Sequence, residues 1–413
     1  MMNGRNGFDR WLARHRESFV EDIAALVAVD TTTPNEPAAF SWLRDYFERL
    51  GGTVSHEPRH AALLDHPAAN HNEYAQLPPE DRGTLRVDFP APTAGGAHTL
   101  FSGHVDVVPP GPDFPLAFEP KEADGRLVGR GTADTKGNIV MLAAALRYLA
   151  DAGIPLRRGV TLDLVPEEEI GGNGALSTVL HGRDADEVVV LEPTGLEVFH
   201  GHRGCAGFAV EIGGRSSHMG GSGLSAIDGA VEFLALLREL EAELLDEART
   251  DPAFAGVDRP VQINVGTIAG GEWPGSIPER CTVGGHFGFH PRYSTAAVLG
   301  MLSDLVSRLR DPWLRTHSRV RLRGIHNGAY LGDPDERVAR DLRAAVRATG
   351  AAVAQRRAWH VSCDARLYHE ELGLPTVVFG AGRLADAHSS HEALDIDEWG
   401  RGVAALAGFL GTW

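Results

Sequence analysis

The sequence predicts an α/β protein, with a mixed, largely parallel sheet flanked by helices and interrupted by a small α+β domain. Between residues 99 and 191, short apolar runs alternate with helical patterns, which is typical of βαβ units. Near residue 206 the order changes to strand, helix, strand, strand, helix, strand, which predicts a ferredoxin-like layer. The chain has 413 residues, more than one hydrophobic core usually organises. We therefore expect at least two domains.

Each predicted element follows from hydrophobic periodicity and from turn signals at its ends. Before the inserted domain we expect helices at 17–29, 37–50 and 139–150, strands at 99–102, 160–165 and 187–191, and a long surface loop at 56–82. Inside it we expect strands at 206–212, 261–268, 280–289 and 318–323, and helices at 225–247 and 295–310. A helix at 337–348 and a strand at 375–379 follow. The main domain should thus cover 1–206 and 326–413, and the inserted domain 207–325.

Composition and charge exclude several classes of protein. The formal net charge is −17, because 56 Asp and Glu residues outnumber 39 Lys and Arg residues. Such a surface repels phosphate backbones and anionic lipid headgroups, so neither nucleic acid nor membrane is expected as a partner. The three cysteines form no CxxC pair, and the N-terminal segment has no apolar signal region. These features favour a cytoplasmic protein.

Histidine and acidic residues follow apolar runs at five places, where an α/β sheet presents ligand-binding groups. They are His104 with Asp106, Asp134, the run Glu167–Glu168–Glu169, Glu192, and His388 with His391. Each place alone has a plainer interpretation, such as a structural His–Asp pair, a helix N-cap or a solvated acidic run. Together they supply a mixed nitrogen and oxygen set, which suits Zn²⁺ or a neighbouring transition metal better than Ca²⁺. The sequence therefore predicts a metal site.

The motifs around these residues carry a family resemblance that covers almost the whole chain. They are GHVDVVP (103–109), GRGTADTKG (129–137), PEEEIGG (166–172), LEPT (191–194), GRSSHMGG (214–221) and AHSSHE (387–392). In this order and spacing, the chain resembles the family of acetylornithine deacetylase, succinyl-diaminopimelate desuccinylase, aminoacylase and glutamate carboxypeptidase. The resemblance implies a catalytic main domain and an inserted lid and dimerisation domain.

The resemblance also implies a ligand set for two metal ions per chain, Zn²⁺ with Co²⁺ or Mn²⁺ as alternatives. Asp134 would bridge the two ions. One site would be completed by His104 and Glu192, and the other by Glu169 and His388. A cis peptide bond is expected after the bridging aspartate, between Asp134 and Thr135.

Three further residues acquire catalytic roles from the resemblance. Glu168 would be the general base that takes a proton from the metal-bridging water, and Asp106 would support His104. His218, in the inserted domain, would reach the scissile carbonyl oxygen from the partner subunit of a homodimer.

These implications predict a metal-dependent hydrolase that cleaves a linear amide bond of a small N-acylated substrate, most simply an N-deacylase. An exopeptidase or dipeptidase using the same site is the alternative. A non-catalytic metal-binding protein is a more distant one, since candidates for all five ligands and the base are present.

One position departs from the family pattern. Many members carry an arginine that holds the substrate carboxylate where this chain has Gly288. Without that guanidinium, simple N-acyl-α-amino acids should bind poorly. The nearest candidates for a substitute are His290, Arg292, Arg280 and His326.

Overall fold

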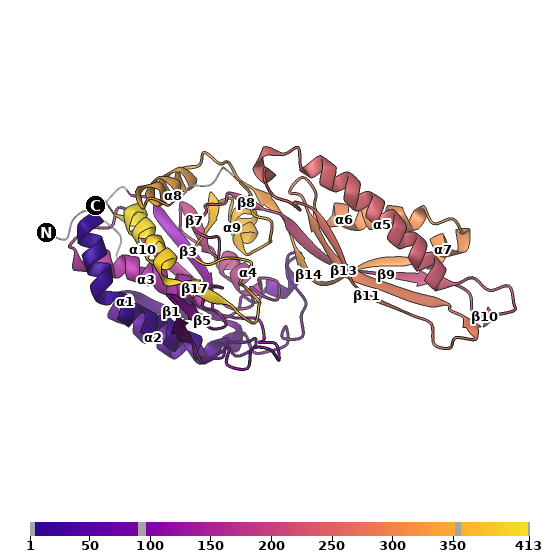
Figure 1. The fold of residues 1–413 in the computed structure, drawn as a ribbon, viewed down its shortest axis with the longest axis horizontal. Coiled ribbons are helices and arrows are strands. Elements are labelled where there is room, and N and C mark those ends of the chain that lie inside the picture. The colour runs from indigo at the N-terminus through magenta and orange to yellow at the C-terminus, as the bar shows by residue number, and fades with distance from the viewer. Residues whose placement is uncertain (1–4, 90–95, 352–356, 412–413) are drawn as a thin grey trace. The chain divides into compact units, whose positions relative to one another are not determined.

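The computed structural model describes residues 5–89, 96–351 and 357–411. The chain divides into two compact units (Figure 1). The large unit contains Met1–Gly201, Gly332–Arg356 and Leu367–Trp413, and the small unit contains His202–Leu331 and Arg357–Arg366. We assigned 357–366 to the main domain from the sequence, whereas in the structure it belongs to the small unit. Among the described residues, no helix is long and apolar enough to cross a bilayer.

A six-stranded sheet forms the centre of the large unit, in the order β1-β2-β6-β3-β7-β16. Strands β6, β3, β7 and β16 are parallel, whereas β2 and β1 add an antiparallel edge. Every residue of β6 and β7 is buried, as expected for parallel strands covered on both faces. The strands are β1 (Thr53–Glu57), β2 (Thr84–Phe89), β3 (His98–His104), β6 (Gly159–Val165), β7 (Glu187–Leu191) and β16 (Thr376–Phe379).

Helices surround this sheet, and α10 packs against α3 and α8 while α1 packs against α3. Aromatic contacts join α1 to α10, because Phe19 lies between Trp11 of its own helix and Trp399 of α10 at ring-centroid distances of 5.6 and 5.7 Å. The helices are α1 (Arg5–Val27), α2 (Phe40–Arg49), α3 (Lys136–Asp151), α4 (Asn173–Leu180), α8 (Arg337–Ala348), α9 (Ala365–Leu372) and α10 (Ile396–Leu410). A three-stranded sheet adds β4 (Lys121–Ala123), β5 (Arg126–Val128) and β17 (Ala393–Asp395).

The small unit is a four-stranded antiparallel sheet in the order β11-β13-β9-β14. Its core includes Phe208 and Phe287 from the sheet and Phe233 from α5. The chain order of strands and helices is the predicted ferredoxin-like one. The elements are β9 (Gly204–Gly213), α5 (Ala226–Ala248), β11 (Gln262–Gly270), β13 (Arg280–Phe289), α6 (Thr295–Ser307), α7 (Pro312–His317) and β14 (Arg319–Asn327). Short strands β10 (Ser217–His218) and β12 (Ser276–Ile277) pair with each other, as do β8 (Gly201–His202) and β15 (Tyr330–Leu331).

The predicted α/β class is confirmed, but several elements were missed or shortened. Helix α10 was not predicted, because the three glycines of IDEWGRGVAALAGFL are poor helix formers. Helix α1 begins at Arg5, well before the predicted start, because Phe8 and Trp11 are buried and extend its apolar face. The segment 56–82, expected as a surface loop, begins with the last two residues of β1 and contains two 3₁₀ turns, Leu63–Asp65 and Pro79–Arg82.

Candidate active site

Strand ends bring the predicted site residues of the large unit together. His104 is the last residue of β3, Glu192 follows β7, and the acidic run follows β6. Because β6, β3 and β7 are parallel neighbours, their carboxyl ends meet at one edge of the sheet. The remaining candidates, Asp134 and His388, come from the loop before α3 and the loop after β16.

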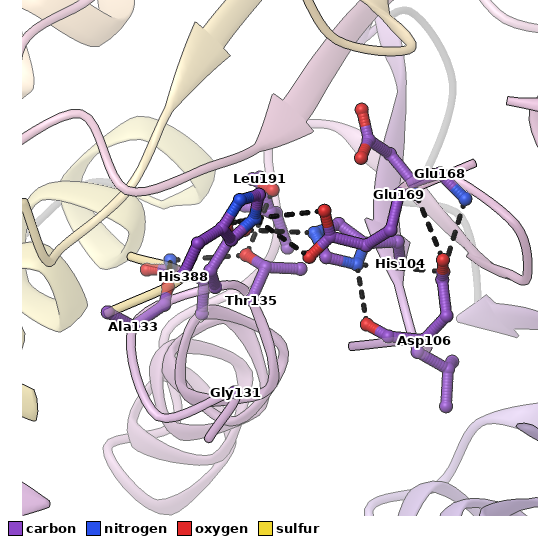
Figure 2. A network of polar contacts seen from close by, with 12 residues as sticks. His104, Asp106, Gly131, Ala133, Thr135, Glu168, Glu169, Leu191 and His388 are labelled. Atoms are coloured by element: carbon purple, nitrogen blue, oxygen red, sulfur yellow. Dashed lines mark hydrogen bonds and ion pairs between the residues drawn. The ribbon is translucent and has the colours of Figure 1, made fainter. Parts of the chain in front are cut away.

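The carboxylate of Asp134 lies between two histidines. Its Oδ1 atom is 3.0 Å from Nε2 of His104, and its Oδ2 atom is 3.3 Å from Nε2 of His388. The peptide bond from Asp134 to Thr135 is cis, as the family resemblance implied. Glu169 completes the group, since its carboxylate oxygens are 2.9 and 3.1 Å from Nε2 of His388. Figure 2 shows the side chains of His104, Glu169 and His388 pointing toward one another.

Asp106 fixes the backbone of the acidic run. Its carboxylate accepts hydrogen bonds from the amides of Glu168 (3.2 Å) and Glu169 (2.9 Å) (Figure 2). Nδ1 of His104 is 2.9 Å from the backbone carbonyl of Asp106, whereas the nearest carboxylate oxygen is 3.7 Å away. The support for His104 therefore comes from the main chain of Asp106. The side chains of Glu168 and Glu169 leave the backbone in different directions (Figure 2).

Glu392 is a site residue that the sequence reasoning did not single out. Its Oε1 atom accepts hydrogen bonds from three backbone amides of the loop that carries Asp134, those of Gly131, Ala133 and Asp134, at 2.9 to 3.1 Å. Its Oε2 atom pairs with Arg130 at 2.5 Å. The carboxylate thus holds the loop in place. Its position in the AHSSHE motif was the available signal, but only the structure shows which loop it contacts.

The donor set fits a pair of transition-metal ions. One ligand atom each from His104, Asp134 and Glu169 lies within 4.8 Å of the others, and the same is true of His104, Glu168 and Glu192. The Oε1 atom of Glu192 is buried and accepts no hydrogen bond from the described residues. A buried carboxylate oxygen without a donor is costly unless a cation compensates it.

Electrostatics support the same interpretation. Burial alone would lower the pKa of His388, but hydrogen bonds to Asp134 and Glu169 raise it to about 11. In His104, burial also opposes the charged form, yet Asp134 and Glu192 raise its pKa well above the usual value. Burial raises the pKa of Glu192 well above its usual value, and the charge of Asp134 adds to this. The site is strongly negative, and a cation would stabilise it.

The family model of peptidase family M20/M25/M40 matches residues 100–412. The chain belongs to this family. Its members are hydrolases that act on amide bonds, so the protein is an enzyme of the M20 type.

Relatives within the family differ in substrate. N-formyl-4-amino-5-aminomethyl-2-methylpyrimidine deformylase from Bacillus subtilis is 26% identical, with 97% of this chain and 95% of the relative covered. Acetylornithine deacetylase from Myxococcus xanthus is 29% identical, with 93% and 94% covered. A dinuclear metal-binding M20 peptidase from Bacillus subtilis has the same fold, with a TM-score of 0.65 at 12% identity and 96% and 98% covered.

Two sequence-predicted positions lie in the small unit of this M20 protein. His218 is exposed on β10. Gly288 pairs with Cys205 across β13 and β9, and a Cβ atom at Gly288 would lie 2.9 Å from Cζ of Arg203. A guanidinium therefore does occupy the space beside Gly288, but it comes from Arg203 on the neighbouring chain segment.

The sequence reasoning missed Arg203 because strand neighbours cannot be read from one sequence. Two of the residues proposed as substitutes have other partners. Nε2 of His290 is 3.0 Å from Asp251, and Arg292 pairs with Glu247. Burial lowers the pKa of Arg203, and its Nη1 donates to the backbone carbonyl of Arg259 at 3.1 Å.

Proposed function

We propose that the protein is a metal-dependent N-deacylase that hydrolyses a linear amide bond in a small N-acylated substrate. The observation that carries this proposal is the position of Asp134, with one carboxylate oxygen near His104 and the other near His388. A carboxylate flanked in this way can bridge two ions, with His104 and Glu192 on one side and Glu169 and His388 on the other. Zn²⁺ suits this nitrogen and oxygen set, and Co²⁺ or Mn²⁺ can replace it.

Bound metal ions would lower the pKa of a water molecule and polarise the amide carbonyl. The protein residues then have separate tasks. Glu168 takes the proton of the attacking water and passes it to the leaving amine, while Asp106 holds the Glu168 amide. Glu392 keeps the Asp134 loop in place through three backbone hydrogen bonds.

We further propose that the small unit pairs two chains, and that His218 then acts across the subunit interface on the scissile carbonyl. Exposed apolar side chains of the small unit support pairing, among them Trp273 (72% exposed), Met219 (70%) and Val231 (60%). Strand β11 is also an edge of its sheet, and its Ile268 is 53% exposed. The cytoplasmic location stays a prediction.

A substrate panel tests the proposal. Purified protein, reconstituted with Zn²⁺, Co²⁺ or Mn²⁺, is assayed against N-formyl, N-acetyl and N-succinyl amines and amino acids, and against dipeptides. Turnover of the acyl amines that chelation abolishes is the expected result. Preference for dipeptides would favour the exopeptidase alternative, which the peptidase members of the family support. Tight metal binding with no turnover of any amide would favour the non-catalytic alternative.

A further inference from the structure

A buried arginine lies behind the acidic run of the large unit. Nε of Arg82 is 2.7 Å from Oε1 of Glu167, and its two terminal nitrogens are each 2.7 Å from an oxygen of Glu36. The exposed fractions of these side chains are 0% for Arg82 and Glu36 and 2% for Glu167. Two carboxylates thus share one guanidinium in the absence of bulk water.

The second oxygen of Glu167 is also engaged. It accepts hydrogen bonds from Nδ2 of Asn72 (3.1 Å) and Nδ2 of Asn173 (2.9 Å). Asn72 and Arg82 belong to the segment between β1 and β2, which the sequence predicted as a surface loop. Part of that segment is therefore a buried support for the acidic run.

The backbone of Glu167 is in the left-handed region, with φ of +64°. A non-glycine residue adopts this conformation at a cost, and it persists where the surroundings determine it. The three hydrogen bonds that its carboxylate accepts, from Arg82, Asn72 and Asn173, supply that constraint. Glu168 and Glu169 come next, with their amides held by Asp106. The turn is therefore held at two consecutive places: at the side chain of Glu167 and at the backbone amides of Glu168 and Glu169.

We propose that Arg82 is a positioning residue for the hydrolytic site. Through Glu167, and with its charge balanced by Glu36, it sets the turn that aims Glu168 and Glu169 in their separate directions. Without the guanidinium, two buried carboxylates would lose their shared counter-charge, and the turn would relax to expose Glu167 to water. This inference rests on the proposed function of Glu168 and Glu169.

The structure offers a matched control for the test. Arg183 is also a buried arginine that bridges two carboxylates of the large unit, with Nε 2.7 Å from Asp163 and Nη2 paired with Glu57. Its side chain is 2% exposed, and it donates to Asp163, Glu57 and the carbonyl of Gly182, none of which belongs to the acidic run. Arg82→Lys and Arg183→Lys therefore disturb similar charge clusters, only one of which supports the turn.

The experiment compares these two variants with the unmodified protein in three measurements: thermal unfolding, Co²⁺ titration followed by visible absorption, and steady-state kinetics. We expect both variants to lose thermal stability to a similar extent. Only Arg82→Lys should change the Co²⁺ spectrum and weaken Co²⁺ binding, by about 10-fold or more, as loss of support behind metal ligands does. Its kcat should fall by about 10- to 100-fold with little change in KM.

An Arg82→Lys variant that matches Arg183→Lys in Co²⁺ spectrum, Co²⁺ affinity and kcat would overturn the proposal. If Arg82→Lys does not fold, Glu167→Gln carries the same test, because it keeps the shape of the side chain and removes its charge. The Co²⁺ measurements need no substrate. Failure of the proposed function would therefore appear as absent turnover in every protein, while the Co²⁺ comparison still decides the role of Arg82.

Discussion

Nε2 of His388 lies 2.9 Å from Oε2 of Glu169, although 219 positions separate the two residues in the chain. The two side chains come from the loops after β16 and β6, which are not neighbouring strands of the sheet. Asp134 lies within reach of the same imidazole nitrogen. Three segments from distant parts of the chain therefore converge on one ring.

This convergence predicts that removal of a single proposed ligand lowers the metal content of the protein. The unmodified protein should hold up to two transition-metal ions per chain, and His388→Ala should lose one of them together with most of the activity. Elemental analysis after chelation and reconstitution measures the stoichiometry. His391→Ala, three residues further on, is the control and should keep both ions. Full activity after exhaustive removal of metal would contradict the assignment.

Glu168→Gln should keep both metal ions and lose about 10²- to 10⁴-fold in kcat, because the general base is removed while the proposed ligands remain. Glu169→Gln should instead lose metal. Measuring metal content and kcat for both variants separates the two roles. The reverse pattern would shift the assignment of the base by one residue.

Action of His218 across a dimer predicts complementation between inactive variants. When His218→Ala and Glu168→Gln chains are mixed and allowed to exchange, one of the two hybrid sites has both residues intact. Activity should rise toward half that of the unmodified dimer, and the assay needs verified heterodimers. If such heterodimers stay inactive, His218 acts within its own chain or in no catalytic step.

The guanidinium of Arg203 beside Gly288 changes the expectation for substrates. A charge-assisted hydrogen bond to a carboxylate is strong and directional, so we expect the protein to prefer an N-acyl amino acid to its carboxamide. Arg203→Met should reduce that preference by about 10-fold or more, measured as the ratio of kcat/KM values. Arg292→Met is the control, because Arg292 is already paired with Glu247. An unchanged ratio in Arg203→Met would show that Arg203 does not contact substrate.

Burial of His202 predicts that the small unit loses stability as the pH falls. The ring is completely buried, which lowers its pKa to about 3 from the usual value of 6.5. Since the folded form binds the proton less well, its contribution to stability is complete above pH 6.5 and is lost as the pH falls toward 3. For one proton, the free energy of unfolding changes by at most about 1.4 kcal/mol per pH unit. Denaturant unfolding measures this free energy at each pH. Between pH 6.5 and 4, it should fall less steeply with decreasing pH for His202→Asn than for the unmodified protein.

Elements with strong periodicity or with uninterrupted apolar runs were predictable from the sequence. The bounds of β7, β13 and α8 agree with the predicted ones, because each is a short, well-delimited run. Helix α10, with three glycines among its 15 residues, was missed. The antiparallel edge of the sheet was also missed, since β1 has mostly exposed residues and resembles a loop.

Four of the five proposed ligands follow strands of the sheet, Asp134 precedes α3, and the resemblance to the family assigned their roles. The structure brings all five large-unit candidates to one region, although their metal-binding roles remain proposals. What could not be predicted is the identity of the residues behind them. Arg82, Arg203 and Glu392 each act on a partner that is distant in the chain or on a neighbouring strand, and nothing local in the sequence marks that partner.

The insertion of the small unit has a consequence for synthesis of the protein. His388 is the last of the five proposed ligands to leave the ribosome, and β16, which completes the parallel sheet, precedes it only shortly. All residues of the small unit precede His388 in the chain, and its core lies between Ala206 and Leu314. It can therefore fold while the large unit still lacks an edge strand and a ligand. A nascent chain of this design cannot assemble the proposed metal site until His388 has been translated, after every residue of the small unit.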